Sequence, residues 1–200
     1  MSPRPTAKQL GSDPSMAEIQ PPKPSLSLRK MSDTLLGEYR NAPSGQYVDI
    51  RRLVEKIKVT KRRLYEIMSI MEYFGVVRKE VRDTYYWTGL NNIAQAVQTK
   101  VFDAPPDQQP HKTSFTNLCH RLVCLFVSRP VLSIVDARDE LGLGSMPARC
   151  KRLYDIANIL ESLGLIAKSV KVGGKQLYMW QGPLPPASTT SPVSVTTTPL

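Results

Sequence analysis

Long apolar runs and paired cysteines are missing from this sequence. The longest purely apolar run extends only from Leu122 to Val127, whereas a membrane-spanning helix needs roughly 20 such residues. The chain holds 3 Cys and 2 His, with neither a Cys-Xaa-Xaa-Cys pair nor a paired-histidine spacing. This pattern argues against a disulfide framework and against zinc. We therefore expect no membrane role, no metal and a reducing compartment.

Catalytic signatures are missing as well. There is no glycine-rich phosphate loop, nucleophile elbow or acid pair, and Gly142 and Gly144 in Leu-Gly-Leu-Gly-Ser are typical of a loop before a helix. The residues that zinc could use are too irregularly spaced, and Cys119 and Cys124 are expected to pack as small hydrophobic side chains. The full set is His111, Cys119, His120, Cys124 and Cys150. We expect neither an enzyme nor a cofactor.

Acidic residues are fewer than basic ones, and the excess is unevenly placed. The chain holds 27 Lys+Arg against 17 Asp+Glu, for a formal net charge of +10. Residues 25–90 hold 13 against 8 and residues 112–183 hold 10 against 5, while the remaining segments hold 4 against 4. A basic surface on each of two parts suits a polyanionic partner. Charge alone is equally compatible with two basic domains that bind nothing.

Three segments lack hydrophobic periodicity. Residues 1–24 are rich in Pro, Ser and Lys, residues 184–200 are almost entirely Pro, Ser, Thr and Val, and the segment from Asp103 to Pro110 is interrupted by Pro. Such composition is typical of disordered tails and linkers. We expect a tail at 1–24, a module at 25–93, a linker at 94–112, a second module at 113–183 and a tail at 184–200.

An internal repeat relates the two modules. Residues 62–77 and 151–166 share Arg-Leu-Tyr, an acidic residue and Ile, followed by Glu-Xaa-Xaa-Gly and two apolar residues, at a constant offset of 89. Further on, Trp87-Thr88-Gly89 corresponds to Trp180-Gln181-Gly182 at an offset of 93. A match of this length and order indicates a duplicated structural unit.

Each unit is predicted to contain three helices and a β-hairpin. Apolar residues of the third helices repeat at helical spacing and should be core: Leu64, Ile67, Met68, Met71, Leu153, Ile156, Ala157 and Leu160. Gly75 and Gly164 stand where a left-handed C-cap ends such a helix. The fold class is therefore α+β, with two tandem winged-helix (helix-turn-helix plus β-hairpin wing) modules and disordered tails.

The remaining elements follow from apolar spacing, plausible N-caps and turn signals. First helices are expected from Leu28 to Tyr39 and from Phe115 to Val127, and second helices from about Asp49 to Ile57 and from Ser133 to Leu141. The hairpin strands are expected at 76–81 with 84–88 and at 165–172 with 175–181. Gly173-Gly174 is a strong tight-turn signal, and Arg82-Asp83 is a weaker one.

A basic pair stands near the start of each third helix: Arg62 with Arg63, and Lys151 with Arg152. A recognition helix enters the major groove with this end, where Arg can bind guanine O6 and N7. Cations there oppose the helix dipole, so their presence in both repeats indicates an anionic partner. The alternative to DNA binding is that these basic side chains are only a solvated first turn of each helix, in ion pairs with Glu66 and Asp155 of the same helices. Tyr65 and Tyr154 either bond to a buried acceptor or reach a DNA phosphate.

These residues carry a family resemblance. Arg-Arg-Xaa-Tyr-Asp-Ile, followed by Leu-Glu-Xaa-Xaa-Gly-Leu-Ile and a closing Trp-Xaa-Gly, resembles the DNA-binding domain of the E-two-F cell-cycle transcription factors. Two such domains in tandem resemble the atypical branch, and the segment from Trp87 to Ile93 is similar to the end of its first domain. The resemblance covers about residues 25–93 and 113–182. It implies a nuclear protein that binds GC-rich promoter DNA, usually as a repressor, without a dimerisation-partner subunit.

The resemblance also assigns residues to DNA. It implies that the guanine-reading residues are Arg62, Arg63, Lys151 and Arg152 and that the residues near the DNA backbone are Tyr65 and Tyr154, to which we add Lys61 and Arg149. Glu66 replaces the motif's Asp, and Lys151 replaces its first Arg. Module one is therefore expected to be the stricter reader of guanine. The family places an arginine ahead of the first helix in the minor groove, and Lys23 is the nearest candidate, which we do not assign.

We predict a sequence-specific double-stranded DNA-binding transcription factor, a repressor of cell-cycle genes, that uses the third helix of each module. The alternative is a tandem winged-helix scaffold for protein interactions, because winged helices host both roles. A neutral or apolar third-helix face would favour that alternative. No sustained heptad repeat predicts a coiled-coil dimer, and self-association of two chains stays open.

Overall fold

A computed structural model describes residues 27–103, 114–144 and 146–184. The expected tail at 1–24, all but Leu184 of the tail at 184–200, and most of the segment from Asp103 to Pro110 lie outside these residues. Lys23 and His111 lie outside them as well. No helix in the described ranges is both long enough and apolar enough to cross a membrane.

The chain repeats one order of elements twice. The first unit contains α1 (Leu28–Tyr39), β1 (Tyr47–Asp49), α2 (Ile50–Ile57), α3 (Lys61–Tyr73), β2 (Val77–Val81) and β3 (Thr84–Trp87). The second contains α5 (Phe115–Ser128), β4 (Val131–Ser133), α6 (Ile134–Glu140), α7 (Pro147–Ser162), β5 (Ile166–Val172) and β6 (Lys175–Trp180). These two helix-plus-hairpin units confirm the expected α+β class with tandem winged helices.

Each hairpin belongs to a three-stranded antiparallel sheet, in the orders β1-β3-β2 and β4-β6-β5. The short third strands β1 and β4 were not predicted, because three residues are too few to show a period of two. They form by pairing with the hairpin, with Val48 opposite Tyr85 and Leu132 opposite Tyr178. The turn at Gly173-Gly174 has the positive φ values of 55° and 76° that a tight hairpin requires.

The helix ends follow the predicted capping. The Asp49 side chain accepts a hydrogen bond from the Arg51 backbone N–H, and the Ser133 hydroxyl accepts one from that of Asp136. Gly75 and Gly164 end α3 and α7 with φ of 66° and 74°, the left-handed conformation expected of them. The predicted core residues of both third helices are at most 1% exposed.

The start of α7 corrects one expectation. Because α7 begins at Pro147, Lys151 and Arg152 lie in its second turn, whereas Arg62 and Arg63 lie in the first turn of α3. The helix dipole acts mainly within the first turn. The dipole argument made for the two basic pairs therefore applies to Arg62 and Arg63 alone, because the loop before α7 is longer and its Pro starts the helix earlier.

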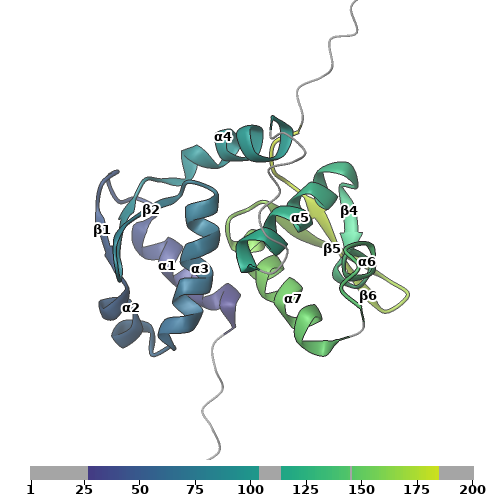
Figure 1. The fold of residues 1–200 in the computed structure, drawn as a ribbon, viewed down its shortest axis with the longest axis horizontal. Helices are drawn as coiled ribbons and strands as arrows, with labels where there is room; N and C mark the ends of the chain where they lie inside the picture. Colours follow the sequence, from purple (N-terminus) through teal and green to yellow (C-terminus); the bar gives the residue numbers. More distant parts are fainter. Residues whose placement is uncertain (1–26, 104–113, 145, 185–200) are drawn as a thin grey trace, which may run out of the picture.

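Helical structure continues from the first sheet into the expected linker at 94–112. After a 3-10 turn at Leu90–Asn92 (η1) come α4 (Ile93–Val97) and a π-helical turn at Gln98–Phe102 (η2). Val97 is fully buried, and Lys100 Nζ donates a hydrogen bond to the Tyr73 carbonyl at the end of α3. In Figure 1, α4 lies across the top of the molecule between the two units.

The two units pack together reciprocally. The first helix of each contacts the third helix of the other, α1 against α7 and α5 against α3, so that α3 and α7 lie together in the middle and the sheets on the outer sides (Figure 1). Tyr73 and Ser162 are equivalent positions of the repeat, and each makes a hydrogen bond to the first helix of the other module. Tyr73 shares one of 2.8 Å with His120 Nδ1, and the Ser162 hydroxyl donates one of 3.3 Å to the Arg29 carbonyl. Arg29 also pairs with Glu161.

A second buried stripe on each third helix explains this packing. Ile70 and Ile159 occupy equivalent repeat positions, lie about 100° from the core stripe, and are both 0% exposed. On α3 the same stripe continues through the half-buried Glu66 and Tyr73. This side of α3, turned away from the module's own core, is part of the interface between modules.

Candidate nucleic-acid interface

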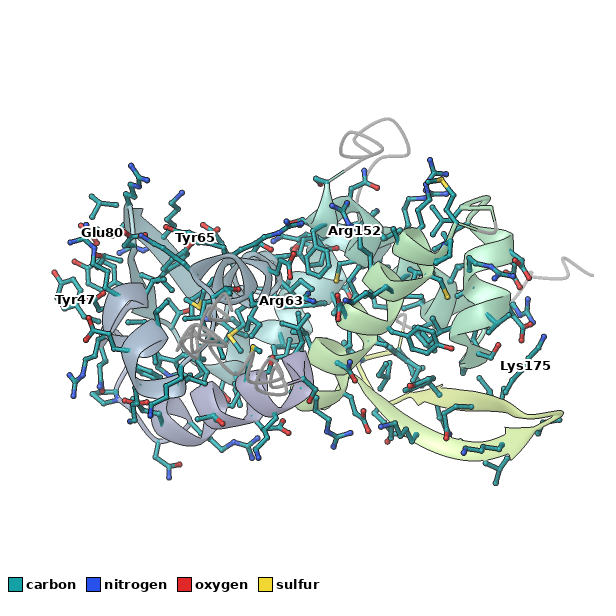
Figure 2. The ribbon with its side chains drawn as sticks, turned by 90° about the horizontal axis from the view of Figure 1, so that it is seen from below. Tyr47, Arg63, Tyr65, Glu80, Arg152 and Lys175 are labelled. Carbon is teal, nitrogen blue, oxygen red and sulfur yellow. The ribbon has the colours of Figure 1, made fainter. Side chains whose placement is uncertain are left out.

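Arg63 and Arg152, one from each predicted base-reading pair, lie on one side of the molecule. Figure 2 views it from below Figure 1, from the side at which α3 and α7 begin, and shows Arg63 in the middle with Arg152 on the neighbouring α7. The structure thus brings one arginine of each basic pair to a common side, as two readers of one duplex would require. It also shows that the four side chains are not equally available.

On α3, the two arginines differ in exposure and pairing. The Arg62 side chain is 79% exposed, with its Nε 3.5 Å from Glu66 Oε1. The Arg63 side chain is 30% exposed, and its Nη1 donates hydrogen bonds to Glu66 Oε2 at 2.8 Å and to Asp155 Oδ2 of module two at 2.9 Å. The pairing with Glu66 was an alternative open to the sequence. The bond to Asp155 was not predicted, because no single-chain spacing indicates it.

On α7, the basic side chains are freer. Lys151, Arg152 and Tyr154 are exposed, and within the ranges that the structure covers neither Lys151 nor Arg152 makes an ion pair. Arg149 is exposed and its Nη1 donates a hydrogen bond of 3.1 Å to the Leu143 carbonyl, in the loop before the helix. Module two therefore presents the more accessible cationic surface.

Asp83, in the turn of the first hairpin, organises the start of α3. Its carboxylate accepts hydrogen bonds from Lys61 Nζ at 2.5 Å, from the Tyr65 hydroxyl and from Arg51 Nε at 3.3 Å. These bonds, chiefly from Lys61 and Tyr65, lower the pKa of Asp83 to about 2. One buried carboxylate thus ties α2, α3 and the wing together.

This network involves two residues that were predicted to contact the DNA backbone, Lys61 and Tyr65. Lys61 and Tyr65 already bond to Asp83, so Tyr65 has the buried acceptor that was one of its two alternatives. In module two the turn is Gly173-Gly174, which offers no carboxylate, and Tyr154 stays 39% exposed. Sequence reasoning noticed Asp83 only as a weak turn signal. Asp at a left-handed turn position, here with φ of 70°, was the available clue.

We predict that Asp83 stabilises the fold only while it is ionised. Its pKa is lowered by folding, so the stabilisation is present above the ordinary value of 3.8 and is lost as the pH falls toward about 2. Asp83→Asn should therefore melt at a lower temperature than the wild type at pH 6, and the difference should shrink toward zero near pH 2. Asn tolerates the positive φ, so the backbone is preserved. Thermal melting followed by circular dichroism measures both.

The control for this experiment is Asp33→Asn, which removes the same charge from an exposed position on α1, 3.6 Å from Arg29. We expect it to change the melting temperature much less at pH 6. A gap between wild type and Asp83→Asn that persists unchanged at pH 2 would mean that shape, and not charge, accounts for the role of Asp83.

The cysteines and His120 form no metal centre in the described part of the chain, where no group of three or more His, Cys, Asp or Glu side chains comes together. Cys119 is fully buried, as expected of a small hydrophobic side chain, and burial raises the pKa of its thiol. Cys124 Sγ lies 3.6 Å from His120 Nε2, and burial lowers the pKa of His120. His120 serves the interface with Tyr73.

Comparison with known proteins finds one family in both modules. Residues 25–89 and 111–182 match the E-two-F/DP family winged-helix DNA-binding domain. The chain is 22% identical over 239 residues to transcription factor E2F8 of Bos taurus, covering 82% of this chain and 28% of that protein. It is 24% identical over 195 residues to E2FE, an E-two-F transcription factor-like protein of Arabidopsis thaliana, covering 68% of this chain and 48% of that protein.

Human E2F8 is similar too, at 23% identity over 251 residues, which cover 87% of this chain and 29% of that protein. The chain thus spans between about a quarter and a half of the length of these relatives. The resemblance to the atypical branch is confirmed, as is the expectation that the chain is not an enzyme, because the family is one of DNA-binding proteins. With both segments matched and both folded as helix-plus-hairpin units, the chain belongs to the E-two-F/DP family and carries its winged-helix DNA-binding domain twice.

Proposed function

We propose that this chain is a nuclear transcription factor that binds GC-rich promoter sites in double-stranded DNA and represses cell-cycle genes without a dimerisation-partner subunit. Residues 25–93 and 113–183 are the two DNA-binding units, and residues 94–112 join them. The observation that carries the proposal is the basic pair on each of α3 and α7, with both helices beginning on the same side of the molecule (Figure 2).

Partner independence is supported by the packing of the modules. Each first helix contacts the third helix of the other module, which is the reciprocal arrangement of a symmetric dimer. Under this proposal the second module takes the role of a second subunit. Repression and GC preference rest on the family resemblance. Binding-site selection from random DNA with the chain alone tests the site and its valency, and a promoter-reporter assay tests repression.

The proposal also predicts a steep salt dependence. Neutralising several phosphates releases counterions, so that log affinity falls linearly with log salt. A slope near zero in an anisotropy titration would contradict DNA binding and favour the protein-scaffold alternative. Size-exclusion chromatography with light scattering, with and without DNA, tests whether two chains associate.

Arg152→Ala is expected to weaken binding to the selected site by about 1–3 kcal/mol while leaving binding to random duplex nearly unchanged, because a guanine contact carries sequence information and a phosphate contact does not. Competition titrations against both duplexes measure the two losses. Arg129→Ala is the matched control, since Arg129 is a module-two arginine that lies at the end of α5 and pairs with Glu140 of α6. Equal losses on both duplexes would reassign Arg152 to phosphate.

A further inference from the structure

The bond between Arg63 and Asp155 joins the two recognition helices directly. Arg63 lies on α3 of module one, and Asp155 lies on α7 of module two, 92 residues away in the chain. Arg63 also binds Glu66, and the three side chains form one charged cluster. The cluster is largely shielded from solvent, with side-chain exposures of 30% for Arg63, 19% for Glu66 and 15% for Asp155. A charge-assisted bond at such a position is stronger and less screened than one at the surface.

The cluster is asymmetric although the modules are repeats. Glu66 is equivalent to Asp155, so the symmetric counterpart of the bond would join Arg152 to Glu66. Glu66 instead binds Arg62 and Arg63 of its own helix, and Arg152 makes no ion pair within the described residues. The longer Glu side chain can reach back one turn along α3. Asp155 of module two thus binds Arg63 of module one, and no carboxylate among the residues that the structure describes binds Arg152.

The geometry leaves Arg63 able to bind a base. Both carboxylates engage Nη1, and bidentate recognition of guanine needs two N–H groups, which Nη2 and Nε can supply. A guanidinium anchored at one nitrogen has already lost much of its rotamer freedom, so less entropy is lost when it contacts a base. With Asp155 absent, only Glu66 would hold the side chain, and Glu66 also binds Arg62.

We propose that Asp155 is a positioning residue for Arg63, so that module two determines how strictly module one reads its half-site. This inference rests on the proposed function. It goes beyond the proposed function because it makes the specificity of module one depend on a residue of module two. It also names Glu66 and Asp155 as the source of the expected difference in guanine discrimination between the two modules.

The test is Asp155→Asn, which keeps the shape and removes the charge. Half-sites are first assigned with Arg62→Ala and Arg152→Ala, since each loses discrimination under its own module. Affinities are then measured for the selected site and for duplexes with a guanine replaced in one half or the other. We expect discrimination in the module-one half to fall by about 3- to 10-fold, the cost of ordering one long side chain. Discrimination in the module-two half should not change.

Two companion variants make the result specific. Asp155→Glu keeps a carboxylate and should retain discrimination better than Asp155→Asn. Asp139→Asn is the matched control, because it removes one negative charge from an exposed site in module two, beside Arg138. It should change affinities for all duplexes alike. Thermal melting of each variant shows whether the fold is preserved.

Several outcomes would overturn the inference. Equal loss in both halves would make Asp155 a general packing residue, and loss confined to the module-two half would make it serve its own helix. Discrimination by Arg63→Ala equal to the wild type would show that Arg63 only joins the modules. If the wild type discriminates and Asp155→Asn does so equally, the inference alone fails. If the wild type prefers no duplex, the proposed function fails first.

Discussion

Replacing Lys151 and Arg152 together by Ala is expected to lower affinity for a site with two half-sites by roughly 10²- to 10⁴-fold, the gain that linking two binding modules can provide. The physical reason is that the modules are packed together, so the second contact follows the first within one molecule. Lys151 and Arg152 are also the exposed basic pair. Fluorescence anisotropy at fixed salt measures the loss, and a footprint should shrink to one half-site.

The control for this prediction is on the DNA. A duplex that carries only the module-one half-site already lacks the second contact, so the double variant and the wild type should bind it within a few fold of each other. Unchanged affinity and an unchanged footprint on the composite site would contradict the two-reader mechanism. Module two would then be a docking surface for a protein.

Ile70→Ala is expected to destabilise both modules together, by about 2–5 kcal/mol. Ile70 is fully buried, and truncation of a buried Ile removes contacts and leaves a cavity. Each module contains one of the two tryptophans, Trp87 and Trp180, which are 1% and 6% exposed. Urea unfolding followed by fluorescence in Trp87→Phe and Trp180→Phe backgrounds therefore reports each module separately. We expect both transitions to shift to lower urea and to coincide.

The comparison variant is Ile159→Ala, at the equivalent position in module two. Because the interface is reciprocal, it should also shift both transitions. If Ile70→Ala moved the Trp87 transition and left that of Trp180 in place, the modules would be independent domains in contact. The effective concentration of the second reader would then depend on the joining segment.

Local patterns allowed most elements to be predicted. The period of 3.6 located the first and third helices, Gly75 and Gly164 ended the third helices in the left-handed conformation, and Gly173-Gly174 marked a hairpin turn. The strands β1 and β4 escaped because they are three residues long, and they exist only by pairing with strands far along the chain. The early start of α7 was not predicted, because the repeated segment begins only at Lys151 and α7 starts four residues before it, at Pro147.

The sequence by itself determined that this chain has two related winged-helix units with a basic pair on each third helix, because helical periodicity, capping and duplication are local properties. Only the tertiary structure decided which of those side chains are free. Arg63 donates a hydrogen bond to Asp155 because α3 and α7 pack together across the module boundary. Tyr65 donates one to Asp83 because the wing packs against α3. Electrostatic partners of this kind depend on distances in space, which residue spacing in one chain does not encode.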